Sequence, residues 1–401
     1  MSNHITKVRM KVCTAAVITI FAMIAVPSSA EGAAEKSTPE WNVSLGYTAD
    51  YWRNFAGGLR TDDVFIGLTA LGVDWKSASG GLRSKVQVIH SNGNSFAEIV
   101  GETNVISNIE ADRATRLLEA WLEYAPEDED RSVKLGLYDL NSEFDVSEVG
   151  GALINSTFGI GVDFAQSGVS GPAIFPWGGL AVRGRWRFDD RWMLQSALID
   201  GAPADPNSPR KFASVDIDSD QGALWVTELE HRTALWRAVV GHWRYSTKFE
   251  EFDGLADGSS KKSRQNSGTY GLIEGPIRQF DDRRLLAVLR LGKANPQFNG
   301  IDSTIQAALV LERPWLRREG EHIAMGVAYA RNGRPARRLA IAAGEALLDK
   351  ETIIEVSWRV PVSERIALQP DLQYVINPGS SPDVDDALAV GLRVEFDLTI
   401  R

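Results

Sequence analysis

The chain has 401 residues, of which 44% are hydrophobic and 24% charged, and its formal net charge is −10. This balance excludes a disordered polyelectrolyte and argues against a nucleic-acid partner. After the first thirty residues, no apolar run approaches the roughly 20 residues that a membrane-spanning helix needs, which excludes a helical membrane protein. The 36 glycines and 12 tryptophans are instead typical of a sheet protein with many tight turns.

The amino terminus has the pattern of a secretory signal peptide. Residues 7–11 carry three cations, residues 12–26 are apolar, and small residues lead up to Ala30. We expect cleavage after Ala30, which leaves residues 31–401 as one mature domain. The chain's one cysteine, Cys13, lies in this leader, so disulfide and thiol chemistry are excluded for the mature protein. Without the three leader cations the net charge falls to −13, so the exported protein is expected to be acidic.

Apolar and polar residues alternate with a period of two at both ends of the mature chain. The pattern runs through residues 41–50 and again through residues 388–398, and it places the apolar side chains on one face of a strand. Segments of the same kind between them bring the expected number to about sixteen strands, each of roughly the nine to eleven residues that a tilted strand needs to cross a bilayer. The internal strands are expected to begin near Val64, Leu82, Leu117, Val133, Leu180, Trp192, Leu224, Trp236, Gly268, Leu285, Ser303, His322, Thr352 and Ile366.

The connections between these segments alternate between short and long. An up-and-down barrel in an outer membrane has short periplasmic turns and long external loops, and its closure removes exposed sheet edges. We therefore expect an all-β fold, a single transmembrane antiparallel barrel. A soluble sandwich is the alternative, but tryptophans at strand ends favour membrane interfaces. The expected short turns are 76–81, 189–191, 232–235 and 361–364, and the expected long loops are 90–116, 139–179, 201–223, 246–267 and 331–350.

If the apolar positions face lipid, the alternate positions line the lumen. A barrel of about sixteen strands leaves an aqueous channel. Adjacent guanidiniums on one strand are tolerable there because water, carboxylates or a polar solute can compensate them. The inward positions are expected to include Arg83, Lys85 and Gln87, then Glu119, Trp121 and Glu123, and then Arg183, Arg185 and Arg187.

This inner face has the chemistry of a sugar site. Guanidiniums and carboxylates can hydrogen-bond sugar hydroxyls, and an aromatic ring such as Phe175 or Trp177 can stack on a pyranose. The connection 139–179 has no evident periodicity, and folded into the lumen it would narrow the channel. Residue types alone leave open whether the channel selects sugars or is a general or anion-preferring porin.

Several stretches resemble the carbohydrate-selective porin (OprB) family, and together they cover about a third of the chain. These stretches are Leu140-Asn141-Ser142-Glu143-Phe144, Leu153-Ile154-Asn155-Ser156-Thr157-Phe158-Gly159, Asp163-Phe164-Ala165-Gln166-Ser167-Gly168, Phe175-Pro176-Trp177, Asp200-Gly201-Ala202-Pro203-Ala204-Asp205-Pro206 and Gln369-Pro370-Asp371-Leu372-Gln373-Tyr374-Val375-Ile376-Asn377-Pro378-Gly379.

The resemblance implies a sixteen-stranded outer-membrane barrel whose third external loop folds inward against basic wall residues. Such a channel passes glucose and related saccharides passively, and no catalytic residue, metal or cofactor is expected. The implied partners are saccharide solutes, outer-membrane lipid and lipopolysaccharide, with a homotrimer left open. By resemblance, pore-constriction roles pass to Asp139, Asn141, Glu143, Phe175 and Trp177 on the loop and to Arg183 and Arg185 on the wall, beside the inward-facing Arg83, Glu119 and Glu123.

Two points depart from this interpretation or compete with it. Outer-membrane barrels usually end on an aromatic residue, whereas here Phe396 is followed by residues 397–401. The last strand would then shift its register, or its end would extend into the periplasm. An outer-membrane enzyme and a plugged structural barrel remain as rival functions, but no nucleophile-elbow sequence supports the enzyme.

Overall fold

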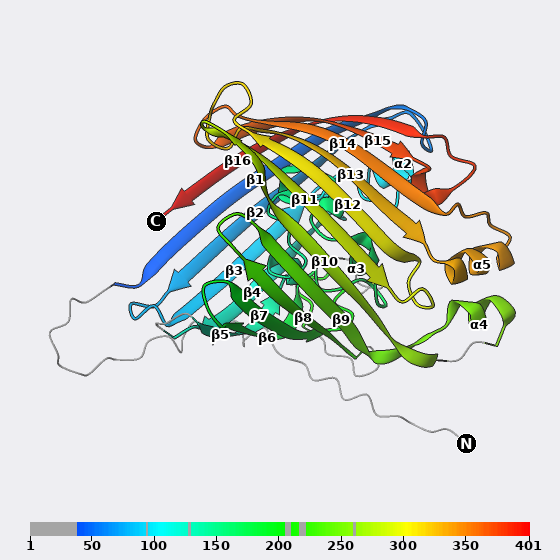
Figure 1. Ribbon diagram of the computed structural model, residues 1–401, viewed down its shortest axis with the longest axis horizontal. Helices are drawn as coiled ribbons and strands as arrows, with labels where there is room; N and C mark the ends of the chain where they lie inside the picture. The colour runs from blue at the N-terminus through cyan, green and yellow to red at the C-terminus, as the bar shows by residue number, and fades with distance from the viewer. Residues whose placement is uncertain (1–37, 94, 127–129, 205–209, 216–221, 260–261) are drawn as a thin grey trace, which may run out of the picture. The chain divides into compact units, whose positions relative to one another are not determined.

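The computed structural model describes residues 38–401 apart from residues 94, 127–129, 205–209, 216–221 and 260–261. These residues form a closed antiparallel barrel of sixteen strands, in which consecutive strands pair and β1 (Glu40–Ala56) also pairs with β16 (Ala387–Ile400) (Figure 1). The expected fold class and strand number are confirmed. The expected signal peptide, residues 1–30, lies outside the described residues.

The remaining elements follow one another in chain order. The other strands are β2 (Asp63–Lys76), β3 (Leu82–Ser91), β4 (Ala114–Tyr124), β5 (Arg131–Tyr138), β6 (Gly179–Arg187), β7 (Trp192–Asp200), β8 (Ala223–Arg232), β9 (Arg237–Glu250), β10 (Lys262–Phe280), β11 (Arg283–Ala294), β12 (Ile301–Glu312), β13 (His322–Asn332), β14 (Lys350–Pro361) and β15 (Ile366–Ile376). The helical segments of the described chain are α2 (Ala97–Val100), η1 (Leu140–Ser142), η2 (Gly150–Ala152), η3 (Ser156–Phe158), α3 (Val162–Ala165), α4 (Phe252–Asp257), α5 (Arg334–Ala342) and η4 (Pro378–Ser380).

The two terminal strands close the barrel along a continuous seam. Tyr47 of β1 lies opposite Phe396 of β16, and Val43 lies opposite Ile400. Residues 397–400 therefore stay in the strand. The end of β16 neither leaves its register nor extends beyond its partner, because backbone pairing with β1 continues past the last aromatic residue.

Side chains alternate between the outer and inner faces of the wall as the sequence pattern predicts. On β16, Leu392 is 42% exposed on the outside, whereas Arg393 is 6% exposed inside. Trp186 and Trp192, which flank a short turn, are about equally exposed, at 41% and 40%. An outer wall of exposed apolar residues with aromatic rings near its rim matches the surface that lipid requires. No helix in the described part of the chain is long and apolar enough to span a bilayer.

The connection between β9 and β10 is shorter than the expected loop 246–267. β9 continues to Glu250 and β10 begins at Lys262, so both strands extend into the expected loop, and α4 lies in the connection between their ends. Arg338 of α5 anchors this connection through two hydrogen bonds of 2.8 Å to the Asp253 carboxylate. These strand extensions consist mostly of charged and polar residues. Apolar residues do not alternate there, so periodicity could not identify the extensions as strand.

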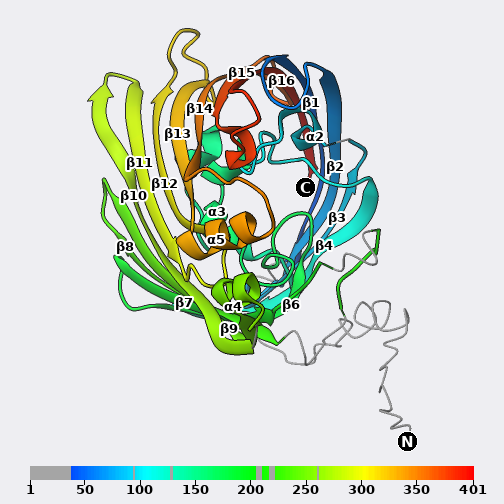
Figure 2. The same ribbon diagram turned by 90° about the vertical axis from the view of Figure 1, so that its right-hand side faces the viewer.

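Two connections fold into the barrel instead of away from it. They are residues 92–113, here called L2, and residues 139–178, here called L3. Figure 2 shows α2 of L2 and α3 of L3 inside the ring of strands. The expectation that the third external loop enters the lumen is confirmed, and β5 is the shortest strand because L3 turns inward directly after Tyr138.

A charge on the outer wall should be costly. Val327 is 40% exposed at the middle of β13, on the same face as Arg331 at the strand's end. Because Val327→Arg places a guanidinium far from either rim, we expect it to reduce the free energy of unfolding by about 2–4 kcal/mol, measured by urea titration in lipid vesicles. Val327→Leu is the control. An unchanged value for the arginine variant would show that this wall does not face lipid.

Candidate functional site

Carboxylates on the barrel wall hold the backbone of L3. Glu228 of β8 accepts a 2.7 Å hydrogen bond from the Asp145 N–H. Glu274 of β10 accepts bonds from the Ser147 hydroxyl and the Val149 N–H, at 2.8 and 3.1 Å. These N–H groups cannot reach water inside the barrel and need acceptors from the wall.

Glu355 of β14 repeats this arrangement on the far side of the lumen. It accepts hydrogen bonds from the Ile154 and Asn155 N–H groups at 2.5 and 3.0 Å. Together with Glu228 and Glu274, it fixes L3 along a path from β8 across to β14.

Arg290 of β11 binds two carboxylates of L3 at once. Its guanidinium binds both carboxylate oxygens of Asp145, at 2.8 and 2.6 Å, and one oxygen of Asp163, at 2.7 Å. Arg290 is 2% exposed, so these ion pairs are shielded from water. L3 approaches so closely that a Cβ added at Gly161 would lie 1.9 Å from Arg290 Nη1. A side chain at position 161 would displace the Arg290 guanidinium from its ion pairs.

L2 is attached by the same chemistry. Glu351 of β14 accepts the Thr103 N–H at 2.8 Å and the Asn104 N–H at 2.7 Å. On the other side of L2, Ser107 donates to Asp50 of β1 at 2.7 Å, and Arg393 binds the same carboxylate. L2 and L3 therefore share one mode of attachment, in which buried wall charges meet loop donors and acceptors.

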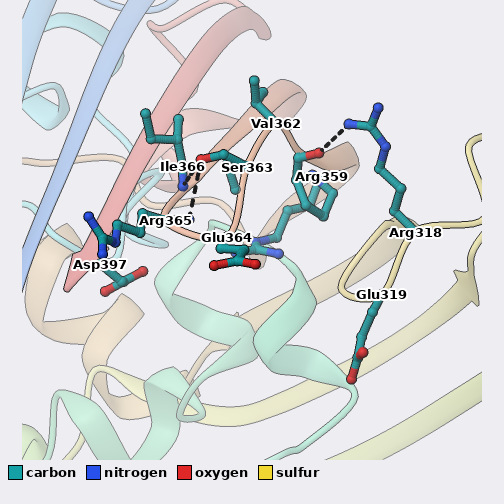
Figure 3. Close-up of a pocket in the computed structure, with 11 residues that line it drawn as sticks. Arg318, Glu319, Arg359, Val362, Ser363, Glu364, Arg365, Ile366 and Asp397 are labelled. Carbon is teal, nitrogen blue, oxygen red and sulfur yellow. Dashed lines mark hydrogen bonds between the residues drawn. The ribbon is translucent and has the colours of Figure 1, made fainter. Parts of the chain in front are cut away.

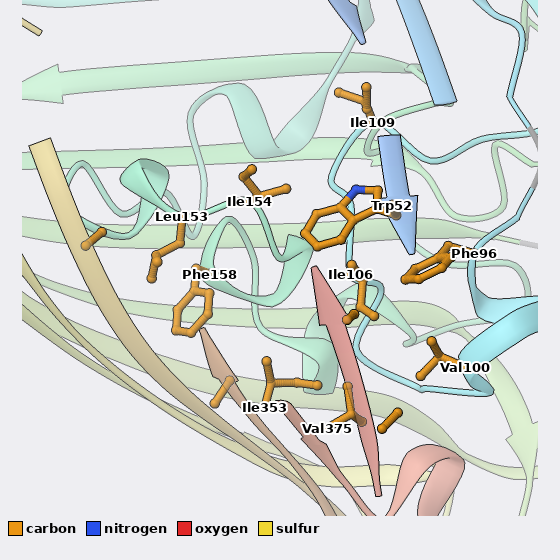
Figure 4. Packing of buried hydrophobic residues seen from close by; sticks show 14 of the residues in the cluster. Trp52, Phe96, Val100, Ile106, Ile109, Leu153, Ile154, Phe158, Ile353 and Val375 are labelled. Atoms are coloured by element: carbon orange, nitrogen blue, oxygen red, sulfur yellow. The ribbon is translucent and has the colours of Figure 1, made fainter. Parts of the chain in front are cut away.

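Apolar packing fills the space between these loops and the wall near β1 and β12 to β16. Trp52 of β1, Phe158 of L3, Ile353 of β14 and Val375 of β15 belong to one buried cluster (Figure 4). The expectation of a polar inner face fails at these wall positions. Their partners are the apolar side chains of L2 and L3, not water, so burying them is favourable.

A second buried cluster lies between L3 and the wall from β5 to β11. Phe164 of α3 stacks on Trp243 of β9, with ring centroids 5.1 Å apart and planes at 6°. Tyr138, Phe144 and Tyr270 belong to the same cluster and are almost fully buried. L3 is thus packed on both sides.

Partly exposed polar side chains face inward on the remaining wall. Lys85 of β3 is 27% exposed and lies 2.5 Å from Glu119 of β4. Glu119 is itself buried, at 3% exposure, and also accepts the Trp121 indole N–H at 3.2 Å. Asp139 and Asn141 at the start of L3 are half-buried, and the Asp139 side chain accepts the Asn141 N–H at 2.9 Å. Here β3, β4 and L3 bring donors, acceptors and an aromatic ring together on the inner side of the wall; we call these five residues the constriction cluster.

Comparison with known proteins identifies the family. The model of the carbohydrate-selective porin, OprB family, matches residues 70–398. The chain belongs to the OprB family. Porin B of Pseudomonas aeruginosa is 22% identical over 413 residues, which covers 88% of this chain and 87% of Porin B. This membership places the protein among outer-membrane channels and not among enzymes.

Solved structures share the fold of this OprB-family chain. The high-pH structure of Pseudomonas putida OprB matches with a TM-score of 0.78 at 16% identity, covering 90% of this chain and 94% of that one. The outer-membrane channel DcaP of Acinetobacter baumannii matches with a TM-score of 0.57 at 11% identity, covering 91% of this chain and 99% of the other.

Several of the residues expected at the OprB-type constriction lie in a buried network at the start of L3. Arg183 is 1% exposed; it binds Glu143 through Nε at 2.7 Å and Glu123 through Nη2 at 2.8 Å. Arg185 and Lys134 also bind Glu143, each at 2.9 Å. Burial alone would raise the pKa of Glu143, but the hydrogen bonds of Arg183 and the three cations hold it well below its usual range. The carboxylate stays charged and ties L3 to β5 and β6.

The other expected site residues lie around this network. Glu119, Asp139 and Asn141 belong to the constriction cluster, and Arg83 is half-buried two residues before Lys85 on the same inward face. Arg185 is 30% exposed. At the end of L3, the Trp177 ring lies 4.6 Å from the guanidinium carbon of the buried Arg116, and Phe175 is half-buried.

Sequence reasoning missed the residues that attach L2 and L3 to the wall. Glu228, Glu274, Glu351, Glu355 and Arg290 are all nearly or fully buried. Each is a charged residue at an inward position of a strand whose neighbouring positions are mostly apolar. That placement could have singled them out, but their partners are distant in sequence and carry no common spacing.

The short-turn rim of the barrel has a mixed charge. A cavity of about 530 Å³ is lined there by Arg318, Arg359, Glu364 and Asp397, among other residues (Figure 3). Arg318 donates to the Pro361 carbonyl at 2.8 Å, and Arg359 binds Glu395 at 2.8 Å. Both cations are therefore used within the protein.

Removing the Arg290 guanidinium should loosen L3. Arg290→Met keeps most of the side-chain volume but leaves Asp145 and Asp163 buried without their cation, which we expect to cost about 3–5 kcal/mol of unfolding free energy. Arg284→Met is the matched control on the same strand, because its pair with Glu312 is exposed and such pairs contribute about 0–1 kcal/mol. Equal losses in urea titrations of both variants would contradict the assigned role of Arg290.

Proposed function

We propose that the protein is a passive, sugar-preferring channel whose solute path runs along the inner wall of β3 and β4 and past the start of L3. The observation that carries this proposal is the constriction cluster. Around the buried Glu119, the half-buried Lys85, Trp121, Asp139 and Asn141 offer a charged donor, a charged acceptor, an amide and a ring. Elsewhere the loops pack against the wall.

The cluster suits a neutral polyhydroxylated solute. Hydroxyl groups can replace part of their hydration by bonds to Lys85, Asp139 and Asn141, while a pyranose ring can lie against an aromatic face. Opposite charges alternate along the path, so neither sign dominates the site. Binding must stay weak, because a solute that is held tightly would not leave, and the expected affinity is millimolar.

Within this proposal the arginines have different roles. Arg183 positions L3 through Glu143 and Glu123 and does not contact the solute. Arg185, which is 30% exposed, and Arg83, which is half-buried, stand beside the path and can contact passing solutes. Signal-peptide cleavage after Ala30 and assembly as a homotrimer stay predictions.

Glucose should reduce the ion current through the channel, and Trp121 should contribute to that effect. We expect Trp121→Ala to raise the glucose concentration for half-maximal block about five-fold, since a ring contact is worth about 1 kcal/mol. Trp186→Ala, on the outer wall, is the matched control. The measurement is planar-bilayer conductance against glucose concentration.

Two outcomes separate the alternatives. If the pore conducts and glucose reduces the current at no concentration, sugar preference is wrong and a general porin remains. If conductance is near zero although the barrel is folded, the constriction is a plug and the channel proposal itself fails.

The charge of Asp139 should make ion selectivity depend on pH. Burial, and next the nearby charge of Glu119, raises the pKa of Asp139 to about 7. The carboxyl group is therefore neutral at about pH 5.5 and negative at about pH 8.5, so cation preference should increase as the pH rises through 7. Reversal potentials in a salt gradient measure this change. The Asp139→Asn variant should lose most of this pH dependence. If it keeps the full pH dependence, Asp139 is not the group responsible.

A further inference from the structure

A row of cations crosses the outer face of the barrel at the long-loop ends of β11 to β14. In the strand register Lys293 of β11 lies opposite Ser303 of β12, Ser303 lies opposite Arg331 of β13, and Arg331 lies opposite Lys350 of β14. The next outward positions toward the middle of the wall are apolar or aromatic on three of these strands, with Leu291, Ile305 and Tyr329. The cations thus stand immediately above the lipid-facing surface.

A β-bulge in β12 fixes two of these cations. Ile301 pairs with Asn332 and Ser303 with Arg331, so Asp302 is the extra residue between them. Its carboxylate binds Lys293 Nζ at 2.8 Å and Arg331 at 3.0 Å through both Nε and Nη2, yet Asp302 is only 4% exposed. Because a bulge re-aims side chains, this one holds the Lys293 and Arg331 head groups together at little further entropic cost.

The row keeps an excess of positive charge. Two cations, Lys293 and Arg331, share the single negative charge of Asp302, while Lys350 Nζ lies 5.0 Å from the centroid of the Tyr329 ring. Two neighbouring cations of α5 are neutralised, because Arg337 binds Asp349 and Arg338 binds Asp253. On β1, the outward-facing Arg53 is paired with Asp63. A local excess of cations in a chain of net charge −10 requires an anionic partner or solvent.

We propose that the surface formed by Lys293, Arg331 and Lys350 binds the phosphate groups of the outer-leaflet glycolipid, lipopolysaccharide. The three cations span three strand spacings, about 14 Å, which is wide enough to contact more than one phosphate of a single headgroup. Arg331 uses two of its five N–H donors on Asp302, so others can bind phosphate. The apolar residues below the row would contact the acyl chains of the same molecule. This inference rests on the outer-membrane location and is independent of sugar preference.

The test compares two probes on the purified full-length protein. Rough lipopolysaccharide and the same material after enzymatic removal of its phosphates are titrated in detergent, and bound molecules are counted by native mass spectrometry. We expect the phosphorylated probe to bind at least ten-fold more tightly, with a loss of affinity as salt is raised.

Lys293→Gln/Lys350→Gln is the main variant, since it retains the Arg331 pair with Asp302 and so leaves that carboxylate compensated. It should weaken binding of the phosphorylated probe at least ten-fold and leave glucose block of the channel unchanged. Arg53→Gln, at the long-loop end of β1 and outside this row, is the matched control and should bind as the unchanged protein does. If the double variant folds poorly, Lys350→Gln alone should weaken binding several-fold, because Lys350 lies outside the Asp302 cluster.

Three results would overturn the proposal. The double variant could bind the glycolipid as tightly as the unchanged protein, the dephosphorylated probe could bind equally well, or Arg53→Gln could lose as much affinity as the double variant. The last result would mean that binding follows total charge and not this surface. If glucose does not block the unchanged protein but the phosphorylated glycolipid still binds it, the result counts against the proposed function and not against this surface.

Discussion

A chain segment that leaves water for the inside of a barrel must find a partner for each backbone N–H and C=O group that it buries. L3 cannot form a sheet or a long helix there, and its three short 3-10 helices and α3 satisfy only part of its backbone. Carboxylates on the wall supply the missing acceptors, and Glu228, Glu274 and Glu355 each bind at least one L3 N–H group. The position of L3, and with it the free width of the lumen, depends on these contacts.

The inner wall consequently has two chemistries. Along β12 to β16 it carries apolar or small side chains such as Ala308, Ile353 and Val375, which L2 and L3 cover. Along β3 it carries partly exposed polar groups such as Lys85 and Gln87. The loops packed on the apolar part of the wall occupy space inside the sixteen-stranded barrel, and the wall contacts of L3 hold the edge of that packing in place. A fixed edge is what a site needs to discriminate among solutes of similar size.

Periodicity predicted much of this architecture and failed where partners come from distant parts of the chain. Residues 388–398 show one apolar face, and the structure has β16 there with that face outward. The inward apolar residues Trp52 and Ile353 were missed because two adjacent apolar residues, as at 353–354, do not reveal which one faces the lumen. The sequence placed Arg183 on the inner face correctly, but no spacing rule links it to Glu143, forty residues away. That link makes Arg183 an anchor of L3.

The distribution of the L3 contacts also bears on how the molecule is made. Their wall partners include residues of β6, β8, β10, β11 and β14, and seven strands lie between β6 and β14. Residues synthesised early thus reach their final environment only after much later strands have joined the ring. Assembly would therefore end with the docking of L3 onto the completed wall, which narrows a wide, water-filled barrel.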